Sequence, residues 1–133
     1  MTKTKAQQIM AATEVRAADD VTAAIQDIAA EFEPYIIKQR RHFHKHPELS
    51  LAEERTTSDI ANQLDAMNIP YERPLKTGLV ATLRGTAPDA YREDGTPRRR
   101  ILLRADIDAL PVTEQTGEEF ASINEGCMHA CGH

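Results

Sequence analysis

The sequence has no tryptophan, only two cysteines and few aromatic residues, three tyrosines and three phenylalanines. Two cysteines cannot build a disulfide-rich scaffold, and no apolar run approaches the length needed to span a bilayer. The basic start, Met1 to Lys5, is not followed by the continuous apolar core of a signal peptide. We therefore expect a cytoplasmic protein in which cysteine serves as a ligand or a thiol.

Positive charge is also scarce, because 16 Lys and Arg residues stand against 21 Asp and Glu residues, which gives a formal net charge of −5. This balance argues against nucleic acid or an anionic membrane as the main partner. With 41% hydrophobic and 28% charged residues, the composition is ordinary for a soluble domain. A length of 133 residues is enough for one compact core.

The first part of the chain predicts helices after a mobile extension over residues 1–18. Asp20 is suited to cap a helix, and Pro34 is expected to break it or to start a second segment that continues through Phe43. Pro47 ends that segment. The apolar residues of the first helix form one stripe at helical spacing: Val21, Ile25, Ile28 and Phe32.

A further helix is predicted downstream of Ser50. The stretch Ser50–Glu53 has the capping-box pattern, and Ile60, Leu64 and Met67 follow at helical spacing. This helix should end near Asn68, a residue that tolerates left-handed geometry.

Beyond this helix the hydrophobic pattern predicts strands. The short apolar runs Leu79–Leu83 and Ile101–Leu103 are bounded by turn residues. The polar loop between them, Gly85 to Pro97, should join two antiparallel neighbours. A loop rich in acids, His and Cys follows the second run, which is the arrangement expected of an α/β enzyme.

The last residues carry the most specific chemical pattern. Cys131 and His133 are separated only by Gly132, so a thiolate and an imidazole can meet at one point. Zinc and similar divalent ions favour this mixture of donors. Two donors do not close a site, so further ligands are needed.

Asp106 and Asp108 come directly after the second predicted strand. Strand alternation would put both carboxylates on one side, where they could share a metal ion or orient a ligand. Two solvated acids at a strand end are the simpler interpretation of this pair alone. The presence of Cys131 and His133 in the same chain favours the functional interpretation.

Other His and Cys residues are weaker candidates. Cys127 and Cys131 do not have the CxxC spacing of thiol oxidoreductases, so Cys127 is expected to be incidental. His129 is a minority candidate for a third donor. His42, His44 and His46 are expected to form a polar helix end, because helical side chains two residues apart point to different faces.

Taken together, these residues resemble the opening part of the N-acyl-amino-acid amidohydrolases, which include hippurate hydrolases and indole-acetyl-amino-acid hydrolases. This group is a branch of the aminoacylase/carboxypeptidase-type metallopeptidases. The resemblance covers residues from about 20 onward in four ordered blocks, which are Arg40–Ser50 with Glu53 and Thr56, Thr77–Ala81, Leu103–Pro111 and Met128–His133.

The resemblance implies an α/β catalytic domain with a mixed sheet and helices on both faces, interrupted by a lid or dimerisation domain. Residues 19–133 would form the N-terminal portion of that domain, with an incomplete sheet. It also implies two divalent ions, zinc or manganese, and hydrolysis of the amide bond of an N-acyl amino acid. Cys131 and His133 would be metal ligands, Asp108 would support the site, and Asp106 would have a weaker role. A homo-oligomer is compatible with the full-length protein.

The family's general-base glutamate, further ligands and lid lie beyond the motif at which this chain stops. We therefore expect the N-terminal third of an enzyme, inactive and poorly folded alone. One alternative is a self-contained metal-binding or thiol-redox module. Another is a related aminoacylase or dipeptidase branch, in which His-x-Asp would be expected where this chain has Asp106-x-Asp108.

Overall fold

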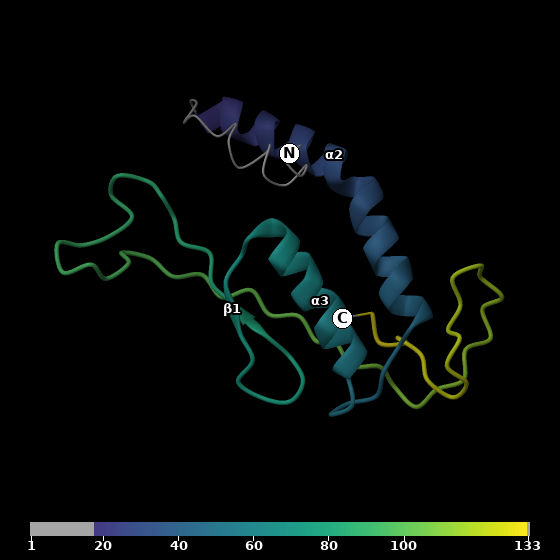
Figure 1. Ribbon diagram of the computed structural model, residues 1–133. Coiled ribbons are helices and arrows are strands. Elements are labelled where there is room, and N and C mark those ends of the chain that lie inside the picture. Colours follow the sequence, from purple (N-terminus) through teal and green to yellow (C-terminus); the bar gives the residue numbers. More distant parts are fainter. Residues whose placement is uncertain (1–17, 133) are drawn as a thin grey trace.

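The computed structural model describes residues 18–132. Four elements lie in this range: helix α2 (Ala18–Lys45), helix α3 (Glu54–Met67), strand β1 (Tyr71–Glu72) and strand β2 (Val80–Ala81) (Figure 1). The extension expected over residues 1–18 lies outside the described residues, except for Ala18, which begins α2. Neither described helix is long and apolar enough to cross a membrane.

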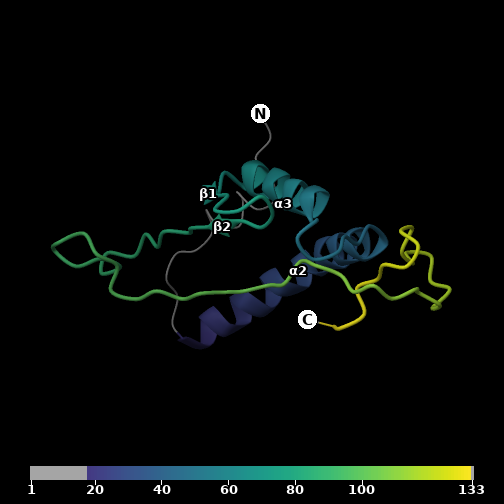
Figure 2. The ribbon, with the colours of Figure 1, turned by 90° about the horizontal axis from the view of Figure 1, so that it is seen from below.

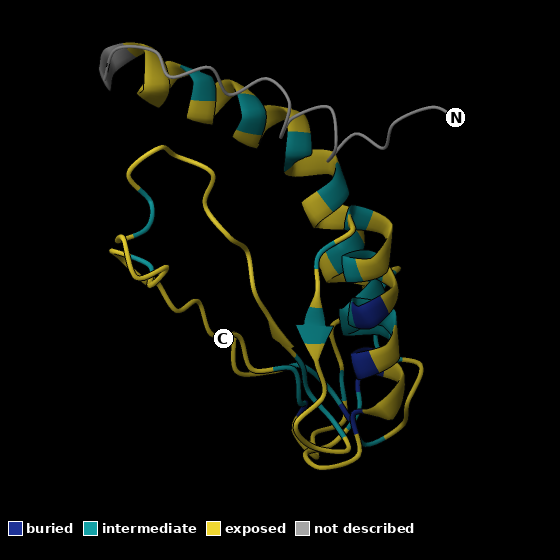
Figure 3. Cartoon of the chain, turned by 60° about the vertical axis from the view of Figure 1, so that its left-hand side comes forward, coloured by how far each residue is buried: buried dark blue, intermediate teal, exposed yellow. Residues whose placement is uncertain are grey.

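Helix α2 continues through Pro34, so the predicted division into two segments is wrong. A proline inside a helix lacks the N–H for one backbone hydrogen bond, and its ring crowds the preceding turn. When the flanking residues favour helix, the result is a bend in a continuous helix. Figure 1 shows that α2 changes direction along its length. In Figure 3 the N-terminal half of α2 is mostly exposed, and Val21 and Ile25 of the predicted apolar stripe are 40% and 61% exposed.

Helix α3 starts later than the capping box predicts. Its N-cap is Glu53, which makes no side-chain capping hydrogen bond. Ser50 instead lies in a turn closed by a 3.0 Å hydrogen bond from the Ala52 N–H to the Leu49 carbonyl, and Leu51 has a φ of 67°. This turn separates Ser50 from the first helical N–H groups, so the predicted cap is wrong.

The carboxylate of Glu48 takes the place of that cap. Its Oε1 accepts a hydrogen bond from the Arg55 N–H at 3.1 Å, and its Oε2 accepts one from the Thr56 N–H at 2.7 Å and one from the Thr56 hydroxyl at 2.8 Å. A carboxylate at this position satisfies free N–H groups and complements the positive end of the helix dipole. At the other end Asn68 adopts φ 56° and ψ 38°, which confirms the predicted left-handed C-cap.

The sheet is small. Strands β1 and β2 are antiparallel, with Tyr71 opposite Ala81 and Glu72 opposite Val80. β2 lies within the predicted strand Leu79–Leu83, whereas β1 was not predicted. The predicted strand at Ile101–Leu103 does not form, since no segment within residues 18–132 pairs with its backbone in a sheet. Its side chains are 87%, 88% and 90% exposed.

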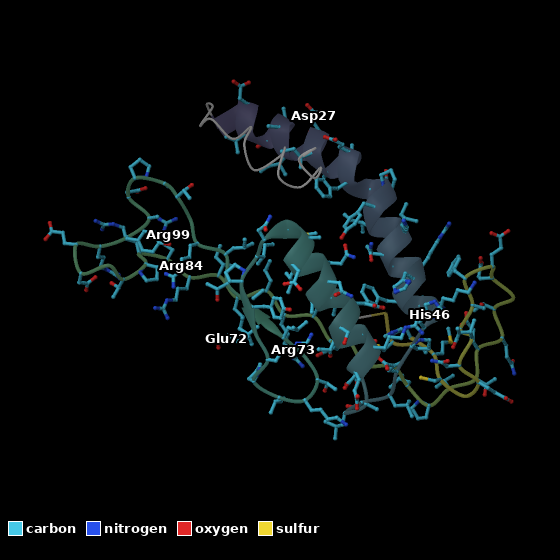
Figure 4. All side chains as sticks on the ribbon, in the orientation of Figure 1. Asp27, His46, Glu72, Arg73, Arg84 and Arg99 are labelled. Atoms are coloured by element: carbon cyan, nitrogen blue, oxygen red, sulfur yellow. The ribbon has the colours of Figure 1, made fainter. Side chains whose placement is uncertain are left out.

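A polar hairpin connects β2 to this exposed run where the sequence predicts a polar loop, but within residues 18–132 the two flanking segments do not pair as the predicted antiparallel neighbours. Tyr91 and Pro97 form an antiparallel bridge, and the turn at Asp94–Gly95 uses the positive φ of 79° that glycine allows. Figures 1 and 2 show the hairpin as an arm that extends away from the helices. Arg84 and Arg99 lie on its two legs (Figure 4).

Most buried residues gather around the segment that links the two helices. Pro47 is fully buried, and the Glu48 carbonyl accepts a 2.8 Å hydrogen bond from the Ala109 N–H. The Asn124 side-chain amide donates to the Pro47 carbonyl at 2.6 Å. Ala109 and Cys127 are 3% and 7% exposed. Residues 47–49 thus join α3 to two segments far along the chain.

Replacing Glu48 with Ala should lower the free energy of unfolding by about 0.5–2 kcal/mol, the usual effect of losing a helix cap, because two N–H groups of α3 lose their acceptor. Replacing Ser50 with Ala is the matched control and should change it by less than about 0.5 kcal/mol. Urea unfolding of both variants, followed by circular dichroism, measures the difference. A larger loss in the Ser50 variant would contradict the observed capping.

Candidate active site

A pocket of about 400 Å³ lies where the C-terminal part of α2 and the first turns of α3 meet two later segments, residues 105–108 and 129–132. The two helices supply basic, polar and apolar side chains, and the two segments supply acids, a histidine and a thiol. The lining residues are Arg40, Phe43, His44, Thr56, Ile60, Ala105, Asp106, Ile107, Asp108, His129, Cys131 and Gly132.

Three of the four predicted site residues line this pocket: Asp106, Asp108 and Cys131. The Asp106 carboxylate also pairs with the Arg104 guanidinium at 2.6 Å, and both side chains are well exposed. Gly132, which follows Cys131, has a φ of 74°, the left-handed geometry that glycine adopts easily. His133 lies outside the described residues.

His129 belongs to the same pocket wall. Its Nε2 is buried and has no hydrogen-bond partner among the described residues. Burial lowers the pKa of His129, and the nearby His44 lowers it further, while the charge and a backbone hydrogen bond of Asp108 oppose the shift. A neutral imidazole with a free nitrogen is the form that binds metal ions.

His44 projects from α2 toward His129, and their ring centroids are 6.5 Å apart. The Nε2 of His44 is 3.1 Å from Oε1 of Glu114, and the two side chains are 12% and 4% exposed. Glu114 also accepts hydrogen bonds from the Ser122 N–H at 2.6 Å and the Thr116 hydroxyl at 2.5 Å. These bonds, first Ser122, then Thr116 and His44, lower the pKa of Glu114 to about 2.

His42 and His46 lie on the opposite side of the helix end. Their rings are 5.0 Å apart, and His42 Nε2 is 2.8 Å from the Asp59 carboxylate. They line a second, shallower hollow of about 240 Å³. Figure 4 shows His46 at the C-terminal end of α2. Burial, followed by the nearby Arg55, lowers the pKa of His46. The three histidines therefore divide between two faces, as helical geometry predicts.

The two cysteines differ in environment. Both are free thiols; Cys127 is buried and Cys131 is exposed. Burial raises the pKa of Cys127, and the charge of Glu48 raises it further, so this thiol resists ionisation. Of the two, Cys131 is the thiol available to an ion or a reagent.

Within residues 18–132, no three His, Cys, Asp or Glu side chains are arranged to hold a metal ion. The donors that line the pocket are nevertheless of the types that zinc and manganese bind, namely thiolate, imidazole and carboxylate. The unpartnered Nε2 of His129 adds a buried polar atom that lacks a bonding partner. The described residues fit a partial metal site that requires further ligands.

Sequence reasoning missed His44 and Glu114. The alternation of His42, His44 and His46 indicates that one of them points away from the other two, but it does not say which face is inward. Glu114 has no local signal, because its bond to His44 joins residues 70 positions apart. Only the folded chain brings these two side chains together.

The pH dependence of stability should reveal Glu114. Because folding lowers its pKa from 4.5 to about 2, the ionised carboxylate stabilises the fold above about pH 4.5, and this contribution is lost as the pH falls toward 2. The stability difference between the wild-type chain and Glu114→Gln should therefore narrow over that range. Unfolding midpoints measured at several pH values test this, and a constant difference would contradict it.

The two thiols should react at different rates. Iodoacetamide at mildly alkaline pH should modify Cys131 first, because Cys127 is buried and its pKa is raised. Mass spectrometry of peptides from the partly labelled chain measures both sites. Under denaturing conditions the two rates should converge. Faster labelling of Cys127 in the folded chain would contradict the structure.

Comparison with known sequences finds peptidases and hydrolases. The model of the peptidase family M20/M25/M40 matches residues 102–133. Uncharacterized hydrolases of Staphylococcus epidermidis and Staphylococcus saprophyticus are each 46% identical to the chain over 99 residues, which are 74% of this chain and 23% of the relative. The chain thus spans about a quarter of the length of the curated relatives that it matches.

Solved structures give the same result. The Bacillus subtilis YXEP protein, described as a dinuclear metal binding peptidase of the M20 family, is 43% identical with a TM-score of 0.66, over 77% of this chain and 27% of that one. An aminohydrolase candidate of methicillin-resistant Staphylococcus aureus is 37% identical with the same TM-score of 0.66, over 80% and 26%. The predicted α/β class is confirmed by these likenesses, and residues 102–133 are similar to the M20 peptidase family.

Proposed function

We propose that this chain forms part of a metal-dependent amidohydrolase that cleaves the amide bond of N-acyl amino acids. The observation that carries the proposal is the meeting of Asp106, Asp108, His129 and Cys131 around one pocket. These residues come from two segments more than 20 positions apart, and they supply the donor types of a zinc or manganese site.

Cys131 and His133 are proposed as metal ligands, and Asp108 as the acid that supports the site. Cys131 is exposed at the pocket, and the positive φ of Gly132 turns the chain directly after it. Asp108 contributes both a charge and a backbone hydrogen bond near His129. Asp106 has the weaker role, since its carboxylate already pairs with Arg104.

A pair of bound divalent ions would supply a water of lowered pKa and would polarise the amide carbonyl of the substrate. The chain's own residues would hold the ions and shape the pocket. Phe43, Ile60 and Ile107 give the pocket an apolar wall, which favours an apolar acyl group and excludes water. The general-base glutamate and the remaining ligands would come from residues after His133 in a longer polypeptide.

The amidohydrolase branch is favoured over the aminoacylase and dipeptidase branches by the residue at position 106. The latter branches are expected to carry His-x-Asp after this strand, whereas this chain has Asp106-x-Asp108. The dinuclear metal binding described for the Bacillus subtilis YXEP protein, 43% identical to this chain, supports two ions rather than one.

The proposal predicts a metal site that depends on Cys131. With cobalt as the probe, a longer polypeptide that carries this chain should show a thiolate-to-metal absorption band and should hydrolyse members of a panel of N-acyl amino acids when zinc or manganese is added. Cys131→Ala should abolish the band and lower kcat/KM by at least about 100-fold, because a lost ligand disrupts ion binding itself.

Cys127→Ala is the matched control, because this thiol is buried away from the pocket, and it should keep both the band and the turnover. Equal losses in the two variants would contradict the assignment of Cys131. Stoichiometric cobalt binding by the 133-residue chain, with no turnover by either polypeptide, would instead favour a self-contained metal-binding module.

A further inference from the structure

The Glu114–His44 pair lies at the wall of the pocket, which His44 lines, and the proposed ligands do not use it. Glu114 is nearly buried and accepts three hydrogen bonds, from His44, Thr116 and Ser122. Two of these bonds come from its own loop, so the carboxylate is held by the loop as well as by the helix. The third bond reaches across to α2 and fixes the orientation of the His44 ring.

The His44 ring is enclosed on two further sides. Phe120 packs edge-on against it, with ring centroids 5.7 Å apart, and His129 lies at 6.5 Å. Arg41 covers Phe120 at 4.9 Å from its centroid. With one ring nitrogen bonded to Glu114 and aromatic rings on both sides, His44 has few rotamers available.

The segment with the proposed ligands has few other attachments. Met128 exchanges two backbone hydrogen bonds with Leu110, at 2.9 and 3.0 Å. After Met128, residues 130–132 are exposed. The side chain of His129 is therefore the last half-buried anchor before Cys131, and the ring that faces it is His44.

We propose that His44, oriented by Glu114, is a positioning residue that fixes His129 and thereby the placement of Cys131. This inference rests on the proposed function for the ligand role of Cys131. His44 acts through His129 and does not need to contact substrate or metal. Groups that orient a ligand segment typically change metal affinity by 10-fold to 100-fold when they are lost.

The chain provides a matched control in His42. It lies on the same helix two residues earlier, is also bonded to a carboxylate, that of Asp59 at 2.8 Å, and faces the other hollow. The same exchange at His42 removes a histidine–carboxylate bond of similar geometry without touching His129.

The test compares His44→Leu, His44→Gln and His42→Leu in the longer polypeptide, with cobalt as the probe. His44→Leu should weaken cobalt affinity by about tenfold or more, because the His129 ring loses the oriented His44 ring that faces it. His44→Gln keeps an N–H that can reach Glu114, so its loss should stay within about threefold. His42→Leu should leave the affinity unchanged. Melting temperatures of all three report separately on folding.

A second measurement needs no metal. In the metal-free protein, the proton NMR signal of the His129 ring Cε1–H should shift in His44→Leu but not in His42→Leu. A lower melting temperature with unchanged cobalt affinity, equal affinity losses at positions 42 and 44, or an unmoved His129 signal would overturn the inference. If the wild-type protein shows no Cys131-dependent cobalt band, the proposed function fails, and the His129 signal alone then decides whether His44 positions that ring.

Discussion

The described fold depends on Glu48, which bonds to two parts of the chain at once. Its carboxylate accepts from the Arg55 and Thr56 N–H groups at the start of α3, while its backbone carbonyl accepts from the Ala109 N–H. Free N–H groups at a helix start are costly when buried, and Thr56 is only 4% exposed. One residue therefore sets both where α3 begins and where the segment with Asp106 and Asp108 crosses it.

This junction explains why the pocket lies where it does. α2 ends at Lys45, two residues before Pro47, so its last turn leads into the junction, and α3 begins after it. The segments after Asp106 and before Cys131 are held beside them by backbone hydrogen bonds at Ala109 and Leu110. The side chains of Asp106, Asp108 and Cys131 come from loops. Short backbone contacts and the Glu48 carboxylate fix the positions of these loops, which is how rigid elements usually present functional loops.

The sequence could predict features that depend on neighbouring residues. Asn68 ends α3 as expected, because left-handed geometry is a property of the residue itself. The polar loop predicted from Gly85 to Pro97 also forms, and its turn at Asp94–Gly95 again depends on the left-handed geometry that glycine allows. The error at the start of α3 arises where two nearby residues compete for the same N–H groups. Ser50 has a suitable capping pattern, but Glu48 reaches the same N–H groups with two oxygens, and the turn at Leu51 removes Ser50 from reach.

The same distinction applies to the candidate site. Asp106, Asp108 and Cys131, which line the pocket, could be proposed from the sequence because their spacing carries chemical meaning within a few residues. Glu114 and His44 could not be found this way, because each has the sequence context of a solvated surface residue. Only folding brings them into contact across 70 positions of the chain. The Ile101–Leu103 run shows the opposite case, in which a local pattern predicts an element that does not form. Three apolar residues predict a strand, but a strand needs a hydrogen-bonded partner, and no segment within residues 18–132 pairs with this run. Local chemistry therefore indicates the candidate donors, whereas their relative positions are set by contacts between distant segments, such as the bond between Glu114 and His44.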